Sequence, residues 1–170
     1  MNNPVLIILF RFLHVATACV SVGGVFFIRV VFPVGLKSLD NESSRTMLLR
    51  TRRVFKMVVH TCILLLLISG TYNAILNWSG YTQAGPGVGH GLFGLHLLLA
   101  LIVFGLALWM LAGAEPPADL QKWMAVNVVL VFLTIAAAST LKYVREHAKK
   151  PAATVTSTEQ SAPAIMTTMP

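Results

Sequence analysis

None of the six acidic residues in this 170-residue chain lies inside one of its long hydrophobic segments. Proton pumping through an intramembrane carboxylate is therefore excluded, and nothing in the chain resembles a hydrolytic site. Only two cysteines occur, Cys19 and Cys62, and they form neither a CxxC motif nor a zinc-type pattern with histidine. Charged residues make up 11% of the chain against 56% hydrophobic residues, and the mean hydropathy is +0.75. This balance is typical of a polytopic membrane protein.

Four hydrophobic segments are long enough to cross the ~30 Å hydrocarbon core of a bilayer as helices. They run over about 5–31, 54–77, 91–113 and 120–141. The predicted fold class is therefore all-α, a transmembrane four-helix bundle formed by residues 1–150. Residues 151–170 are rich in Ala, Thr, Ser and Pro without hydrophobic periodicity, so we expect this C-terminal tail to be disordered.

Basic residues give the chain a formal net charge of +7, yet most of them flank the hydrophobic segments. In that position they set the topology and contact anionic headgroups, so the expected partner is the lipid bilayer and not nucleic acid. The connector 37–56, predicted as an interfacial loop or short helix, holds six Lys or Arg residues; the loop 78–90 holds none and 142–150 holds four. By the positive-inside rule we place this connector inside and both termini outside a bacterial inner (plasma) membrane.

Ionisable side chains nevertheless occur within three of the hydrophobic segments. His14, His60 and His96 lie in the first, second and third segment, respectively. An imidazole at membrane depth is costly to keep there and by default marks a site for a metal, a cofactor or protons. Because neutral imidazole nitrogens suit both copper and haem iron, these histidines are the predicted metal ligands.

The depth of each histidine indicates which of them can share one metal. At about 1.5 Å of rise per residue, His14 lies roughly 13 Å and His96 roughly 8 Å from the outer end of its helix. His60 lies roughly 25 Å from that end, nearer the basic connector. We therefore predict His14 and His96 as the first ligand pair and assign His60 to a different cluster.

Arg11, Gly23 and Gly24 accompany His14 on the first segment. Their spacing places Arg11 and His14 on one helical stripe, which the two glycines follow closely. A guanidinium one turn from an imidazole can pair with a cofactor propionate, and glycines let a flat ring approach the backbone. These three residues are the predicted cofactor contacts. In the alternative, Arg11 reaches to the headgroups and His14 bonds a neighbouring helix.

The first segment also carries a family resemblance. Over residues 11–27 an Arg, a His three residues on, a double glycine and an aromatic pair resemble the opening helix of copper-resistance D (CopD-like) membrane proteins. The resemblance implies a helical bundle for copper handling, or a small four-helix protein that holds haem b. HemJ-type protoporphyrinogen oxidases are similar in being short helical membrane proteins with an early His. Where they carry Pro-Arg and Tyr-His, this chain has Phe-Ile-Arg-Val-Val-Phe-Pro over 27–33.

Softer ligands accompany the histidines and keep copper open beside haem b as the cofactor. Met57 precedes His60 by one turn, and Cys19 and Cys62 lie at nearly matching depths in adjacent segments. Thioether, thiolate and imidazole are the donors that Cu(I) prefers, so this set can form a transfer path. His90, in the Gly-rich loop, is a further candidate as an entry ligand for the metal.

Three functions stay open at this point, and the residues alone do not decide whether the chain is an enzyme. The first is a His-ligated redox-metal site in copper handling, copper transport or membrane electron transfer, with a redox or copper partner in the periplasm or membrane. The second is a non-catalytic subunit or scaffold, in which histidines pack helices, bind a partner or form a homo-oligomer. It also accounts for Asn127 and Thr134, which we expect to make interhelical hydrogen bonds. The third is a HemJ-like protoporphyrinogen oxidase.

Overall fold

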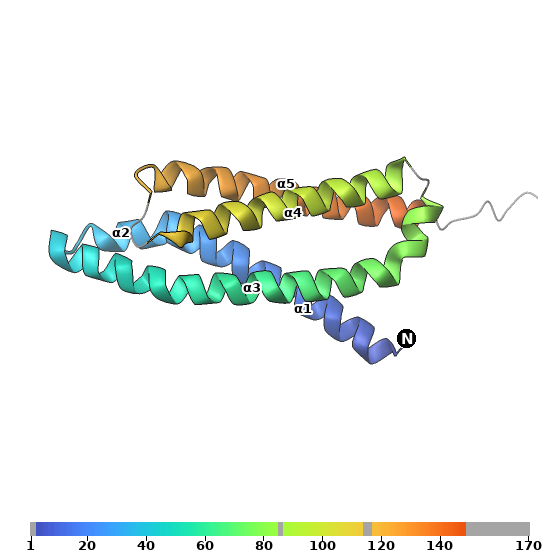
Figure 1. Ribbon diagram of the computed structural model, residues 1–170, viewed down its shortest axis with the longest axis horizontal. Coiled ribbons are helices and arrows are strands. Elements are labelled where there is room, and N and C mark those ends of the chain that lie inside the picture. Colours follow the sequence, from blue (N-terminus) through green and yellow to red (C-terminus); the bar gives the residue numbers. More distant parts are fainter. Residues whose placement is uncertain (1–2, 85–86, 114–116, 149–170) are drawn as a thin grey trace, which may run out of the picture.

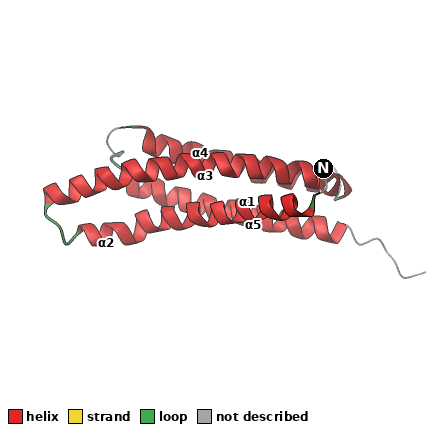
Figure 2. Cartoon of the chain, turned by 90° about the horizontal axis from the view of Figure 1, so that it is seen from below, coloured by secondary structure: helices red, strands yellow, loops and turns green. Residues whose placement is uncertain are grey.

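Helices form the whole regular structure of the described chain. A computed structural model describes residues 3–84, 87–113 and 117–148, and within these ranges there is no strand. Four helical rods among these residues are long and apolar enough to cross a membrane, and they run side by side along one axis (Figures 1 and 2). The predicted all-α bundle is confirmed, and the chain is a multi-pass integral membrane protein. The predicted tail, 151–170, lies outside the described residues.

The helices follow the predicted segments, and two of them extend well beyond these bounds. They are α1 (Pro4–Phe26), the π-helix η1 (Phe27–Val31), α2 (Phe32–Leu36), α3 (Asn41–Gln83), α4 (Val88–Ala112) and α5 (Leu120–Ala148). α1 packs mainly on α3, α4 packs mainly on α5, and contacts between α3 and α4 join the two pairs. α5 also contacts α1 and α3. Since α3 and α5 each contact both α1 and α4, the helices α1 and α4 lie on opposite sides of the bundle. The start of α1 and the end of α5 lie at the same end (Figure 1).

The first rod continues through Pro33, near which the sequence predicted the span to end. A proline has no backbone N–H to donate, and its ring clashes with the carbonyl four residues earlier, here that of Arg29. The π-helix that precedes Pro33 accommodates this conflict, since the backbone N–H of Phe32 donates to the carbonyl of Phe27, five residues back. The rod therefore reaches Leu36 before it ends.

Most of the basic connector belongs to α3. Asp40 caps the start of this helix, because its side chain accepts a hydrogen bond from the backbone N–H of Ser43 at 2.8 Å. The helix then runs for 43 residues, about 64 Å at 1.5 Å per residue, which is about twice the thickness of the hydrocarbon core. Residues 41–53 therefore form a helical extension of the second span at the end where α2 meets α3 (Figure 1).

The Asp40 cap is expected to make the stability of α3 depend on pH. The hydrogen bond from the Ser43 N–H holds the pKa of Asp40 below its ordinary value of 3.8. Because the pKa of Asp40 is lower in the folded protein than in the unfolded chain, the cap stabilises α3 fully at pH values above the ordinary pKa. This stabilisation is lost as the pH falls through the lowered pKa. Circular dichroism melts of the detergent-solubilised protein over that range measure the effect. Asp40→Asn keeps an acceptor that cannot titrate, so equal pH dependence in both proteins would contradict this assignment.

At the opposite end, α3 bends toward α4 and α5 (Figure 1). Tyr81 is buried there, with its ring stacked on that of Phe93 at 5.1 Å between centroids. The guanidinium of Arg145, from the end of α5, lies over the Tyr81 ring at 5.9 Å. Gly89 approaches the backbone carbonyl of Tyr81 so closely that a Cβ at this position would overlap it. Three helices therefore meet around one tyrosine.

Large hydrophobic side chains cover the outside of the rods. Phe12, Leu64 and Phe132, on three different helices, are 70%, 58% and 59% exposed. A surface of this kind on every side is unfavourable in water and suits the hydrocarbon of a bilayer. Trp109 and Trp123, whose ring centroids are 5.3 Å apart, lie at the end opposite Tyr81, as expected of an aromatic belt at the membrane interface.

Candidate metal centre

His14 is held by a hydrogen bond from α1 to α3. Its Nδ1 lies 3.0 Å from Oγ of Ser69, a residue that is fully buried. The hydroxyl of Ser69 donates its single proton to the carbonyl of Leu65 at 2.6 Å. Toward His14, Ser69 Oγ is therefore the acceptor, and His14 Nδ1 carries the proton. Gly70 leaves room for the ring, because a Cβ there would come within 3.3 Å of His14 Cε1.

His96 is held in the same way between the other two helices. Its Nδ1 lies 3.2 Å from the backbone carbonyl oxygen of Thr134 on α5. A carbonyl oxygen only accepts, so Nδ1 is the protonated nitrogen in this ring as well. The hydroxyl of Thr134 donates to the carbonyl of Leu130 on its own helix at 2.8 Å. The predicted interhelical bond of Thr134 is thus made by its backbone carbonyl and not by its hydroxyl.

His14 and His96 come from α1 and α4, the two helices on opposite sides of the bundle, and both are half-buried. Because Nδ1 is the donor in each ring, the lone pair of each imidazole is on Nε2. Metal-ligating histidines typically donate their other ring N–H to an oxygen in this manner. Each ring can therefore offer a neutral imidazole nitrogen to a metal.

His60 is not part of this pair. It is exposed on α3, and its Nδ1 donates to the carbonyl of Lys56 on the same helix at 2.6 Å. Met57 is 62% exposed, Cys19 is exposed and Cys62 is buried. Across the described ranges no three His, Cys, Asp or Glu side chains gather into a group that could hold a metal ion. A copper path through these residues stays a prediction from residue types.

The predicted cofactor contacts are spread along α1. Arg11 is exposed, one turn before His14. Gly23 lies about 13 Å further along the helix axis than His14, with open space where a Cβ would stand. Gly24 packs on the ring of Phe55, and a Cβ there would come within 3.0 Å of that ring. Neither glycine has a contact that links it to the two histidines, so their role at a cofactor also stays a prediction.

His90, the candidate entry ligand, lies near the start of α4 at the end of the bundle that holds Tyr81. It is half-buried, and its ring centroid is 5.2 Å from that of Trp78 at an interplanar angle of 53°. This contact explains its position by packing on an aromatic ring. Nothing among the described contacts of His90 tests a role in metal entry.

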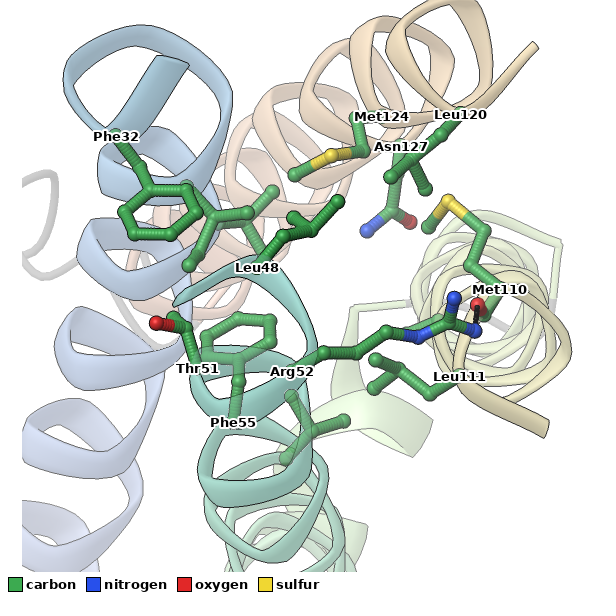
Figure 3. A pocket seen from close by; sticks show the side chains of 14 residues that line it. Phe32, Leu48, Thr51, Arg52, Phe55, Met110, Leu111, Leu120, Met124 and Asn127 are labelled. Carbon is green, nitrogen blue, oxygen red and sulfur yellow. Dashed lines mark hydrogen bonds between the residues drawn. The ribbon is translucent and has the colours of Figure 1, made fainter. Parts of the chain in front are cut away.

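The sequence did not predict a second polar site, at the basic end of the bundle. Arg52 of α3 reaches the last turn of α4 and donates from Nη2 to the carbonyls of Met110, at 2.7 Å, and Gly113, at 3.3 Å. A positive charge there complements both the helix dipole and its unpaired terminal carbonyls. Asn127 of α5 faces the same cavity as Arg52 (Figure 3). The sequence signals that could have pointed to this site were Arg52, at the start of one apolar run, and Asn127, inside another.

Comparison with known proteins assigns no family, because no family model matches the chain and no match was found among curated proteins or solved structures. The likeness of residues 11–27 to the opening helix of CopD-like proteins therefore rests on those residues alone. Function has to be inferred from the geometry of the histidine pair.

Proposed function

We propose that His14 and His96 ligate a redox-active metal centre, haem b or copper, and that the protein acts in membrane electron transfer or in copper handling and transport. The observation that carries this proposal is the hydrogen bonding of the two Nδ1 atoms. Each ring uses Nδ1–H to bond an oxygen of the neighbouring helix, which leaves Nε2 as the basic nitrogen in both. That is the tautomer in which an imidazole binds a metal through Nε2.

The donor set suits either group. A bis-histidine haem needs two neutral imidazoles from different helices of one bundle, and copper also accepts imidazole nitrogen. When bound, either group supplies one-electron chemistry. The chain itself orients the two rings through the Ser69 hydroxyl and the Thr134 carbonyl. The resemblance of residues 11–27 to CopD-like proteins adds support for copper.

The proposed location follows from the distribution of basic residues. With the connector 37–56 inside, His14 and His96 lie nearer the outer face, by the rise of about 1.5 Å per residue. In a bacterial inner membrane this position is within reach of a redox or copper partner in the periplasm or in the membrane.

One competing function is favoured by the same hydrogen bonds. The contacts of His14 with Ser69 and of His96 with Thr134 each tie two neighbouring helices together. Such ties are what a non-catalytic subunit or scaffold needs in a bilayer, where helices gain little from hydrophobic association. In that case the histidines stabilise the bundle without any metal.

The visible spectrum of the detergent-purified protein, oxidised and then reduced with dithionite, tests the proposal. Iron, haem and copper are counted on the same sample after expression with haem precursor and copper supplied. A Soret band that sharpens on reduction, with stoichiometric haem, supports a b-type cytochrome. A colourless protein with stoichiometric copper supports copper handling. A protein that holds neither group contradicts the metal centre and leaves the scaffold.

A further inference from the structure

The outer face of α3 presents polar side chains to the lipid. α3 lies along the lower edge of the bundle in Figure 1, and its buried residues Cys62 and Ser69 mark the side that faces the other helices. His60, Thr61 and Thr71 lie away from that side, and all three are exposed. By contrast, every exposed residue of α4 is Gly, Ala, Val, Leu, Ile or Trp. The outer face of α3 therefore differs from an ordinary lipid-facing surface.

These polar groups keep unused hydrogen-bonding capacity. The Nδ1 of His60 donates to the carbonyl of Lys56, so in the neutral ring Nε2 keeps its lone pair. The hydroxyls of Thr61 and Thr71 make no hydrogen bond within the part of the chain that the structure describes, whereas that of Thr140, exposed on α5, donates to a carbonyl of its own helix. Because the hydrocarbon of a bilayer holds no water to satisfy such groups, a protein neighbour is the favourable partner.

The spacing of the exposed residues on this face is that of a seam between two helices. Five of them follow one another at alternating intervals of three and four positions: Met57, His60, Leu64, Leu67 and Thr71. We call these five residues the α3 seam. Their spacing is the a/d pattern of a heptad repeat, which keeps one side of a helix against a partner helix. The seam is about 21 Å long at 1.5 Å per residue, so it can contact a second helix across most of the ~30 Å hydrocarbon core.

We propose that the protein forms a two-fold symmetric homodimer in the membrane, in which the α3 seam packs on the α3 seam of a second copy. Both copies cross the membrane in the same direction, so the two α3 helices are parallel and equal positions lie at equal depth. The hole that receives each His60 then includes Thr61 of the second copy. The Thr61 hydroxyl donates to the free Nε2, and the symmetry forms the reciprocal bond. Thr71 meets Thr71 of the second copy, and a hydroxyl can both donate and accept.

Complementarity of donor and acceptor favours a second copy over lipid on this face. The Nε2 of His60 needs a donor and the Thr61 hydroxyl needs an acceptor, and the same face supplies both, as an isologous interface requires. Acyl chains supply neither. A polar residue in an apolar seam also fixes the register, because a shifted register leaves it unpaired. No residue of the seam belongs to the pair of His14 and His96, so the dimer is independent of the metal centre.

The oligomeric state of the full-length protein in detergent, measured by native mass spectrometry over a dilution series, tests the dimer. Wild type is expected to be dimeric. His60→Leu and Thr61→Val each remove both reciprocal bonds and are expected to raise the dissociation constant about tenfold, since two hydrogen bonds between membrane helices are together worth about that factor. Thr140→Val removes an exposed hydroxyl that bonds its own helix and should leave the dimer unchanged. A monomeric wild type, or equal weakening by Thr140→Val, would overturn the proposal.

The double variant His60→Leu/Thr61→Val separates a direct bond from a general loss of packing. Because both changes break the same two bonds, the double variant is expected to dimerise as weakly as each single variant and no more weakly. Losses that multiply would mean that the two residues act separately, which contradicts the pairing. Metal content is measured on the same samples and should equal that of wild type, so a failed dimer and a failed metal centre are distinguishable.

Cross-linking in the membrane tests which face the dimer uses. Leu64→Cys places a thiol in the seam, where equal positions of the two copies meet, and is expected to form a disulfide-linked dimer when the membranes are treated with iodine. Leu98→Cys places the thiol on α4 and should stay monomeric, although the two leucines are similarly exposed, at 58% and 56%. Both changes are made in a Cys19→Ala protein, since Cys19 is also exposed. Equal cross-linking of the two variants, or cross-linking through α4 alone, would overturn the proposal.

Discussion

His14→Ala is expected to abolish the bound metal centre while the four helices still form. Removal of one of only two imidazoles ends the bis-histidine coordination that defines the centre, which changes its spectrum and weakens the hold on haem iron or copper. Ser69→Ala keeps the ligand but removes the acceptor that orients it, and should lower metal affinity by about 10- to 100-fold. Metal and haem content, the reduced-minus-oxidised spectrum and far-ultraviolet circular dichroism of the purified variants measure these effects.

His60→Ala is the matched control for this series. It removes an imidazole from the same kind of helix, but that ring is exposed and bonds only the Lys56 carbonyl. The control should keep both the spectrum and the metal content of wild type. A His14→Ala protein with an unchanged centre would contradict the assigned ligand. Lower melting temperatures in His14→Ala and Ser69→Ala, without metal in any sample, would instead indicate the scaffold.

Gly89→Ala is expected to destabilise the protein by about 1 to 3 kcal/mol, the range for overpacking of a tight contact. A Cβ at this position overlaps the backbone carbonyl of Tyr81. Backbone is the least able to move away, so α3 and α4 must separate and the stack of Tyr81 on Phe93 must loosen. Unfolding in detergent titrated with sodium dodecyl sulfate, followed by circular dichroism, measures the loss.

Gly91→Ala provides the comparison, because it lies on the same helix with nothing within 4 Å of its would-be Cβ. Alanine favours the helix over glycine by up to about 1 kcal/mol, so this variant should be as stable as wild type or slightly more stable. If Gly89→Ala unfolds at the same detergent composition as Gly91→Ala, that result contradicts the close packing of α3 on α4 at Tyr81.

The spans were predictable, but the lengths of the helices were less so. Each hydrophobic segment appears in the structure as one rod, since hydropathy over about 20 residues suffices to identify a span. The ends depend on other forces. Asp40 starts α3 well before the apolar run, and α1 passes through Pro33 because a π turn absorbs the missing hydrogen bond. Polar helix and polar loop are alike in composition, so hydropathy does not separate them.

Residue types and depth pointed to the two histidines whose surroundings the structure describes. Depth arithmetic paired His14 with His96, and their sharing of one metal stays a prediction. Their partners were not predicted, because a serine in a leucine-rich run and a backbone carbonyl carry no signal of what they face. The same holds for Arg52, which counted only as one of several basic residues near the membrane surface.

Composition by itself determined that this chain is all-helical, crosses a membrane and carries imidazoles at membrane depth. These properties belong to each segment singly, because the bilayer acts on every helix without reference to its neighbours. Tertiary structure alone decided that His14 faces Ser69, 55 residues away, that His96 faces Thr134, 38 residues away, and that Arg52 shares a cavity with Asn127. Those contacts depend on how each helix is rotated about its axis, which packing against other helices sets and hydropathy does not.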